Sequence, residues 1–131
     1  MEKEYKKYLE DLKVLGEDEI LYVTIDGYLC EIKRQFQQYL CGYINVPIKR
    51  DIVVDPQREE DYYEKIFCDY KVHGGITSFT EFGSHVKIGF DCAHNCDYKP
   101  LAIYNTQYAT YKNVDFVKNE LKKLIKQIKG E

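Results

Sequence analysis

ILYVTIDGYLCEIKRQ, residues 20–35, is the stretch that decides the fold of this chain. Apolar and β-branched side chains alternate with their neighbours over residues 20–25 and again over residues 28–35, which is the period-two pattern of half-buried strands. Asp26-Gly27 stands between the two runs, and this pair supplies the positive φ angles that a tight two-residue turn requires. The sequence therefore predicts an antiparallel hairpin.

Further strand-like segments follow this hairpin. Residues 39–46 are apolar enough for a central strand, which Pro47 ends because proline cannot donate to a sheet ladder. Residues 70–79 and 86–92 also have strand character and are joined through a turn at Gly83-Ser84. Because neighbours joined by a short turn usually pair antiparallel, we expect an antiparallel sheet of about 5–6 strands.

A helix is predicted at each end of the chain. Apolar residues recur at three- and four-residue steps near the N-terminus and Gly16 stops the pattern, so residues 1–16 form an added helix. Asn113 can cap a second helix, whose apolar stripe runs from Val114 to Ile128 before Gly130 ends it. The expected fold class is α+β, with both helices packed on the sheet in a single domain of residues 1–131.

Residues 47–65 carry charge and loop signals, and two interpretations of them stay open. The first is a solvated connection between strands. The second is a short helix that Asp55-Pro56 opens and that continues through Lys65, with the aspartate as its cap and the proline in its first turn.

Composition limits the classes of function. The formal net charge is −3 and no basic face is visible, which disfavours binding to long nucleic acid. No segment approaches the roughly 18 apolar residues of a membrane span, and the N-terminus lacks the apolar run of a signal peptide. Five cysteines, an odd number, predict reduced thiols, so we expect a protein of the host-cell cytoplasm without membrane attachment.

His73-Gly74-Gly75-Ile76-Thr77 is the first candidate segment for a site. Two glycines in a strand-like run often mark a bulge or a backbone that something approaches closely. Exposed N–H groups at such a place can hold phosphate or carboxylate oxygens, and Thr77 could add a hydroxyl. The alternative is a bulge or turn in which His73 is incidental.

The second candidate segment is Asp91-Cys92-Ala93-His94-Asn95-Cys96-Asp97. The spacing of Cys92, His94 and Cys96 argues against a structural zinc site, which normally uses paired ligands with two to four residues between them and a second pair elsewhere in the chain. A metal held by His73, Asp91, His94 or Asp97 is a further alternative, as is a Cys92 nucleophile assisted by Asp91 and a histidine. We expect neither a metal nor a cofactor.

The two candidate segments should converge. The runs at residues 70–79 and 86–92 are joined by a short turn, so antiparallel pairing brings the start of the first beside the end of the second. His73 should then face one pocket with His94, and Gly74-Gly75 should form its wall. We expect the ring nitrogens of the two histidines to lie within about 12 Å of each other, a generous limit for a shared site.

Four segments, in this order, carry a resemblance. They are Cys41-Gly42-Tyr43-Ile44-Asn45-Val46-Pro47, the acidic stretch near Asp61-Tyr62-Tyr63, Val72-His73-Gly74-Gly75-Ile76-Thr77 and Gly89-Phe90-Asp91-Cys92-Ala93-His94. They resemble a family of small, uncharacterised bacteriophage and prophage proteins over about residues 41–128. The chain departs from that family at Val86-Lys87-Ile88, where the family often has aromatic residues, and at Asn95-Cys96-Asp97, where it tends to have Gly-Asp.

The resemblance and the candidate residues together suggest a binding protein rather than an enzyme. Small phage proteins often antagonise host defence, and a glycine cradle with histidines and tyrosines suits capture of a nucleotide-derived signalling molecule. The expected ligand-binding residues are His73, Gly74, Gly75, Thr77, Asp91, His94, Asp97 and Tyr43.

Two alternatives remain. One is a small hydrolase, metal-assisted or not, that uses His73, Asp91 and His94, with Cys92 as a catalytic candidate. The other is an inhibitor of a host protein that binds through an exposed tyrosine-rich surface. The capture protein and both alternatives are compatible with a homo-oligomer.

Overall fold

The hairpin at residues 20–35 forms as predicted. The computed structural model describes residues 2–49, 51–58 and 60–130. In it β1 (Ile20–Ile25) and β2 (Tyr28–Gln35) pair antiparallel, with Ile25 opposite Tyr28. Asp26 and Gly27 form the turn with φ angles of 48° and 88°, the left-handed conformation that the Asp-Gly pair predicts.

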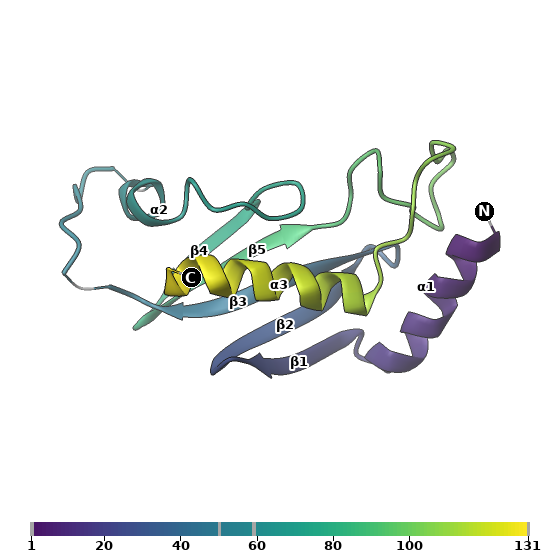
Figure 1. The fold of residues 1–131 in the computed structure, drawn as a ribbon, viewed down its shortest axis with the longest axis horizontal. Coiled ribbons are helices and arrows are strands. Elements are labelled where there is room, and N and C mark those ends of the chain that lie inside the picture. Colours follow the sequence, from purple (N-terminus) through teal and green to yellow (C-terminus); the bar gives the residue numbers. More distant parts are fainter. Residues whose placement is uncertain (1, 50, 59, 131) are drawn as a thin grey trace.

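The remaining strands extend this hairpin into one antiparallel sheet. They are β3 (Tyr39–Pro47), β4 (Ser78–Phe82) and β5 (His85–Asp91), and the described strands have the order β1-β2-β3-β5-β4 (Figure 1). The Gly83-Ser84 turn joins β4 to β5, with Phe82 opposite His85. The predicted α+β fold class is therefore confirmed, and β5 lies inside the sheet between β3 and the edge strand β4.

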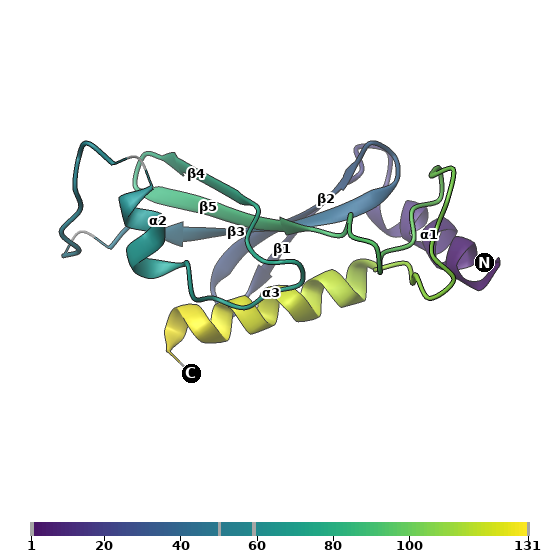
Figure 2. The same cartoon turned by 90° about the horizontal axis from the view of Figure 1, so that it is seen from above.

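One face of the sheet is covered by α3 (Val114–Lys129), as Figure 2 shows. The side chain of Asn113 accepts the Phe116 N–H, and Gly130 ends the helix at a φ of 77°. The helix lies so close to β3 that a Cβ on Gly42 would come 2.9 Å from a methyl carbon of Val117. The apolar stripe of this helix is thus a principal component of the core, with these residues fully buried: Val117, Leu121, Leu124 and Ile125.

The N-terminal helix, α1 (Glu2–Leu15), lies at one end of the sheet, and Met1 is outside the described residues. Polar contacts join it to the segment before α3, since the Glu4 carboxylate accepts the Tyr111 N–H at 2.8 Å. The guanidinium of buried Arg34 lies over the Tyr8 ring and donates to the Tyr111 hydroxyl. The predicted N-terminal helix is therefore present and is joined by these contacts to β2 and to the segment before α3.

One open question is settled and one local prediction is wrong. The described residues 55–58 and Glu60 are not helical, and α2 runs over Asp61–Ile66. The Asp61 carboxylate accepts the Asp55 N–H at 2.7 Å. The connection before α2 follows the first interpretation, a loop. Residues 70–77 are not a strand, because Gly74 and Gly75 have φ angles of 70° and 82°, which no regular strand accommodates.

The cysteines are unpaired, as the sequence predicts. All five lie in the described ranges and are free thiols, with Cys30, Cys41 and Cys92 buried. None of the helices in those ranges combines the length and the apolar character needed to cross a membrane.

Candidate functional site

His73 and His94 meet, as the strand pairing predicts. Their ring centroids are 5.3 Å apart and the rings are nearly perpendicular, at 85°. His73 lies in the turn that precedes β4, and His94 lies in the turn that follows β5. Because β4 and β5 are antiparallel neighbours, the entry to one strand and the exit from the other lie at the same end of the sheet.

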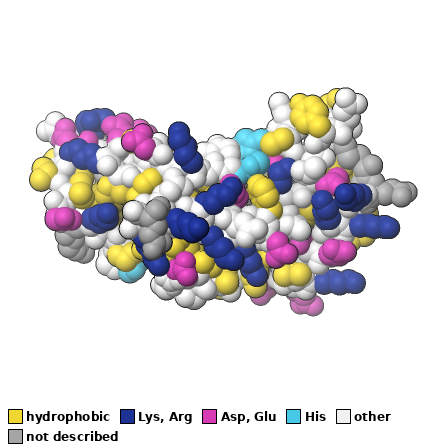
Figure 3. Space-filling model, viewed as in Figure 1, with side chains coloured by type: hydrophobic (Ala, Val, Ile, Leu, Met, Phe, Trp, Pro, Cys, Tyr) yellow, Lys and Arg dark blue, Asp and Glu magenta, His cyan; other side chains and the backbone are white. Residues whose placement is uncertain are grey.

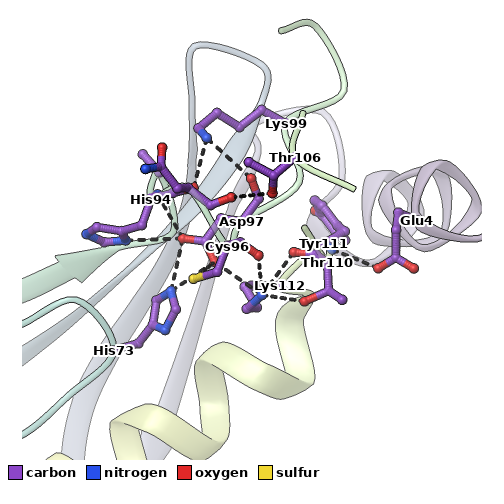
Figure 4. A network of polar contacts seen from close by, with 12 residues as sticks. Glu4, His73, His94, Cys96, Asp97, Lys99, Thr106, Thr110, Tyr111 and Lys112 are labelled. Atoms are coloured by element: carbon purple, nitrogen blue, oxygen red, sulfur yellow. Dashed lines mark hydrogen bonds and ion pairs between the residues drawn. The ribbon is translucent and has the colours of Figure 1, made fainter. Parts of the chain in front are cut away.

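Asp97 is the centre of this cluster (Figure 4). Its side chain is fully buried, and both carboxylate oxygens lie 2.9 Å from Nε2 of His73. The Oδ2 atom is 3.1 Å from Nδ1 of His94 and accepts the His94 backbone N–H at 2.9 Å. The ammonium of Lys112 lies 3.2 Å from Oδ1. A single carboxylate thus holds together three segments that are distant in the sequence.

These contacts keep Asp97 ionised. Burial alone would raise the pKa of its carboxyl group, and this is the largest influence on it. The hydrogen bonds from His73 and from the His94 backbone outweigh burial, so the pKa is lowered from its ordinary value. A buried anion with several donors is the arrangement that compensates for the cost of removing a charge from water.

Asp97 also fixes the orientation of the His94 ring. An ionised carboxylate can only accept, so Nδ1 of His94 carries the proton in this contact. The Nε2 atom then faces away from Asp97 and lies 3.8 Å from Oδ1 of Asp91, while the His94 side chain is 35% exposed. The site therefore presents a partly exposed imidazole ring in a fixed orientation, and such a ring can exchange a proton or bind a ligand atom.

Gly74 provides the space that the His94 ring occupies. A Cβ at Gly74 would lie 2.1 Å from Cε1 of His94, well inside van der Waals contact, and the φ of 70° also favours glycine. Gly75 has a different role, because its N–H donates to the Val72 carbonyl oxygen at 2.8 Å. The amide of Gly75 is thus engaged within the turn, which corrects the prediction that both glycine amides face a ligand.

Thr77 and Asp91 complete the exposed side of the site. The hydroxyl of Thr77 donates to Oδ2 of Asp91 at 3.0 Å, and the Ala93 N–H donates to Oδ1 at 3.2 Å. These bonds hold the Asp91 carboxylate beside His94, so an acidic group and an imidazole share one surface.

The helix α3 positions His73. Oε1 of Glu120 accepts the His73 backbone N–H at 2.9 Å, and the His73 ring stands at 88° to the Phe116 ring with 5.1 Å between centroids. Sequence reasoning missed both helix residues, together with Lys112. Glu120 carried a signal in the sequence, because it stands three residues after Val117 and four before Leu124 and so falls on the apolar stripe. A carboxylate is unusual at such a position, and Glu120 is only 5% exposed.

A groove of about 600 Å³ adjoins the exposed side of the site. The rings of Tyr63 and Phe79 line it in edge-to-face contact, with centroids 5.4 Å apart and an angle of 70° between the rings. Thr77 belongs both to this groove and to the hydrogen bond with Asp91. Figure 3 shows histidine side chains reaching the surface near the middle of the molecule. The other groove residues are Glu60, Ile76, Ser78 and Glu81.

Two of the expected site residues lie elsewhere or are unsuitable. Tyr43 packs over Gly89 and under the Lys87 ammonium, and among the described residues no hydrogen bond or ring contact joins it to His73 or His94. Cys92 is 2% exposed in the main core, and burial raises the pKa of its thiol. A nucleophilic cysteine needs access and a lowered pKa, so this geometry argues against Cys92 as a catalytic residue.

A different cysteine stands beside the histidines. Donor atoms of His73, Cys96 and Asp97 lie within 4.8 Å of one another, which is a grouping able to hold a metal ion. Cys96 is exposed, in contrast to Cys92.

Comparison of the chain with protein-family models, with curated proteins and with solved structures gives no match. The resemblance to the bacteriophage family therefore stays a prediction.

Proposed function

We propose that this protein captures a small nucleotide-like ligand in the groove between the Tyr63 and Phe79 rings and the His94 side chain. The observation that carries the proposal is the connection at Thr77. This residue lines an aromatic groove of about 600 Å³ and also bonds to Asp91, whose carboxylate lies 3.8 Å from Nε2 of His94. Ligand pockets typically have volumes of roughly 300–1,000 Å³ and combine apolar walls with a few polar groups.

The aromatic part of the groove suits a nucleobase. Tyr63 and Phe79 offer ring surfaces, and stacking on aromatic rings tolerates every base because each base has a π-face. The carboxylates of Glu60 and Glu81 line the same groove and can accept hydrogen bonds from exocyclic amines. A base that bears such an amine is therefore the favoured class.

The phosphate groups of the ligand would lie at the end of the groove that adjoins His94. Two carboxylates in the groove repel an anion, so the phosphates or sugar hydroxyls would lie beyond Thr77, against His94. Protonated at both ring nitrogens, His94 would donate from Nε2 to a phosphate oxygen. Asp91 beside it can accept from a sugar hydroxyl. The nucleotide would therefore lie along the groove with its base at the Tyr63 and Phe79 rings and its phosphates at His94.

Capture without turnover is the proposed activity. Thr77, Asp91 and His94 supply hydrogen bonds, and Cys92, the nucleophile suggested by the sequence, is buried. A phage protein that sequesters a nucleotide-derived signal would weaken a host defence that depends on that signal, which is the role that the resemblance implies.

Product analysis tests this proposal. Protein is mixed with a panel of ribonucleoside monophosphates, triphosphates and cyclic nucleotides, separated from free ligand and then heat-denatured. Recovery of an unchanged nucleotide by mass spectrometry supports capture. Retention of no member of the panel by the folded protein contradicts it.

Hydrolysis is the second candidate, and one observation favours it. Asp97 holds Nδ1 of His94 at 3.1 Å and leaves Nε2 at the surface, which is how a carboxylate orients a general base. The same experiment separates the two functions, because a hydrolase releases a nucleotide product in place of the ligand.

A further inference from the structure

We infer that His73, Cys96 and Asp97 form a binding site for a divalent transition-metal ion of the zinc class. This inference does not depend on nucleotide capture, because the His94 ring is not one of the ligands. The three donors are an imidazole, a thiol and a carboxylate, which are side chains that bind zinc in proteins, and water would complete a tetrahedral set.

The donor atoms already have nearly the required spacing. Around a tetrahedral zinc ion, neighbouring ligand atoms are roughly 3.3–3.8 Å apart, given metal–ligand bonds of about 2.0–2.3 Å. Oδ1 of Asp97 is 2.9 Å from Nε2 of His73 and 3.7 Å from Sγ of Cys96, and the three donor atoms all lie within 4.8 Å of one another. Shifts of roughly 1 Å in these side chains would place the atoms around an ion.

Metal binding would replace protons that the cluster now shares. The hydrogen atom between Asp97 and the His73 imidazole would leave, and the Cys96 thiol would become a thiolate. The Nδ1–H of His94 would stay bonded to Oδ2 of Asp97. Nitrogen and sulfur donors select zinc or cobalt over magnesium and calcium, which prefer oxygen ligands.

The positive charge of Lys112 beside Asp97 would repel a metal cation. Its other hydrogen bonds show where the ammonium can stay when a metal binds. Its ammonium lies 3.2 Å from Oδ1 of Asp97 but also donates to the carbonyl oxygens of Cys96 and Thr110, each at 3.0 Å. These carbonyls retain Lys112 when the metal takes Oδ1, the oxygen nearest Cys96. The other carboxylate oxygen, Oδ2, stays bonded to His94.

The support behind the donors is rigid. Glu120 and Phe116 of α3 hold His73, and the Lys99 ammonium donates to the His94 carbonyl oxygen at 3.0 Å and to the Asp97 carbonyl oxygen at 3.3 Å. Groups that orient the ligands in this way are typical of protein metal sites. Cys96 is exposed, so an ion can reach the site from solvent.

Cobalt titration tests the inference on the full chain. Chelator-treated, reduced protein is titrated with Co²⁺, whose tetrahedral complexes absorb visible light and whose thiolate bonds add a charge-transfer band in the near ultraviolet. We expect both features to saturate at one ion per chain and to disappear when Zn²⁺ is added. Native mass spectrometry should then give one zinc ion per chain. Absence of the saturating bands would overturn the inference.

The chain offers matched controls. Cys96→Ser should remove the charge-transfer band, whereas Cys68→Ser, at the other exposed cysteine, should keep it. His73→Ala should weaken cobalt binding by about tenfold or more, as loss of one ligand does, whereas His85→Ala should leave it unchanged. Equal effects of the two cysteine variants, with folding verified by circular dichroism, would contradict the site. Nucleotide binding is measured with and without zinc, so failure of either proposal is seen separately.

Discussion

At the scale of single residues, two separate requirements call for glycine at position 74, namely its backbone conformation and the space beside the His94 ring. Its φ of 70° is one that a side chain rarely adopts, and any Cβ would overlap the His94 ring. The glycine therefore permits both the turn and the position of the imidazole that lies over it.

Gly74→Ala should destabilise the protein by roughly 1–3 kcal/mol, from the positive φ and from displacement of His94. Gly75→Ala is the matched control, because Gly75 has a φ of 82° but no atom within 4 Å of the place that an added methyl group would take. Urea denaturation of both variants measures the difference. Equal losses would mean that the His94 ring does not occupy the space above Gly74.

The cysteines differ in reactivity for the same local reasons. Burial raises the pKa of the Cys30 and Cys41 thiols to about 11 and also raises that of Cys92. Only a thiolate reacts readily with iodoacetamide, so Cys68 and Cys96 should be alkylated in the folded protein while the buried thiols are protected. Peptide mass spectrometry identifies the labelled positions. Rapid native labelling of Cys92 would show that this thiol is not buried in solution.

At the scale of elements, the sequence predicts correctly those helices and strands whose signals lie within a few neighbouring residues. The Asp26-Gly27 hairpin and the C-terminal helix carry turn, cap and periodicity signals within a few residues, and both form as expected. The strand prediction for residues 70–77 is wrong because the conformation of this segment depends on partners that are far away in the sequence. Glu120 of α3 holds its backbone, and the two left-handed glycines exclude a strand.

The helix α3 should contribute much of the stability. Leu121 is fully buried between the helix and the sheet, so Leu121→Ala should cost about 2–5 kcal/mol in the free energy of unfolding. Lys122→Ala, one position along on the exposed side, should change it by less than about 0.5 kcal/mol. Chemical denaturation of both variants checks the difference. A loss below about 1 kcal/mol at Leu121 would show that the stripe faces solvent or a partner.

At the scale of the whole molecule, the fold brings together the two candidate segments that contain His73 and His94. Antiparallel pairing was enough to predict that His73 and His94 converge. Asp97 as their common partner could not be predicted, because its contacts require the loop after β5 to fold back beneath His94. The aromatic groove was also missed, since Tyr63 of α2 and Phe79 of β4 face each other only in the folded chain.

The central claim is that His94 presents its outer nitrogen to a ligand that also occupies the aromatic groove. Isothermal titration calorimetry with the tightest-binding nucleotide of the panel tests this claim most directly, on the wild type, His94→Ala and the remote control His85→Ala. Loss of a charged hydrogen bond should weaken binding by roughly tenfold or more in His94→Ala, with folding of the variant verified by circular dichroism. The control should bind like the wild type. Equal affinities of His94→Ala and the wild type would contradict the account.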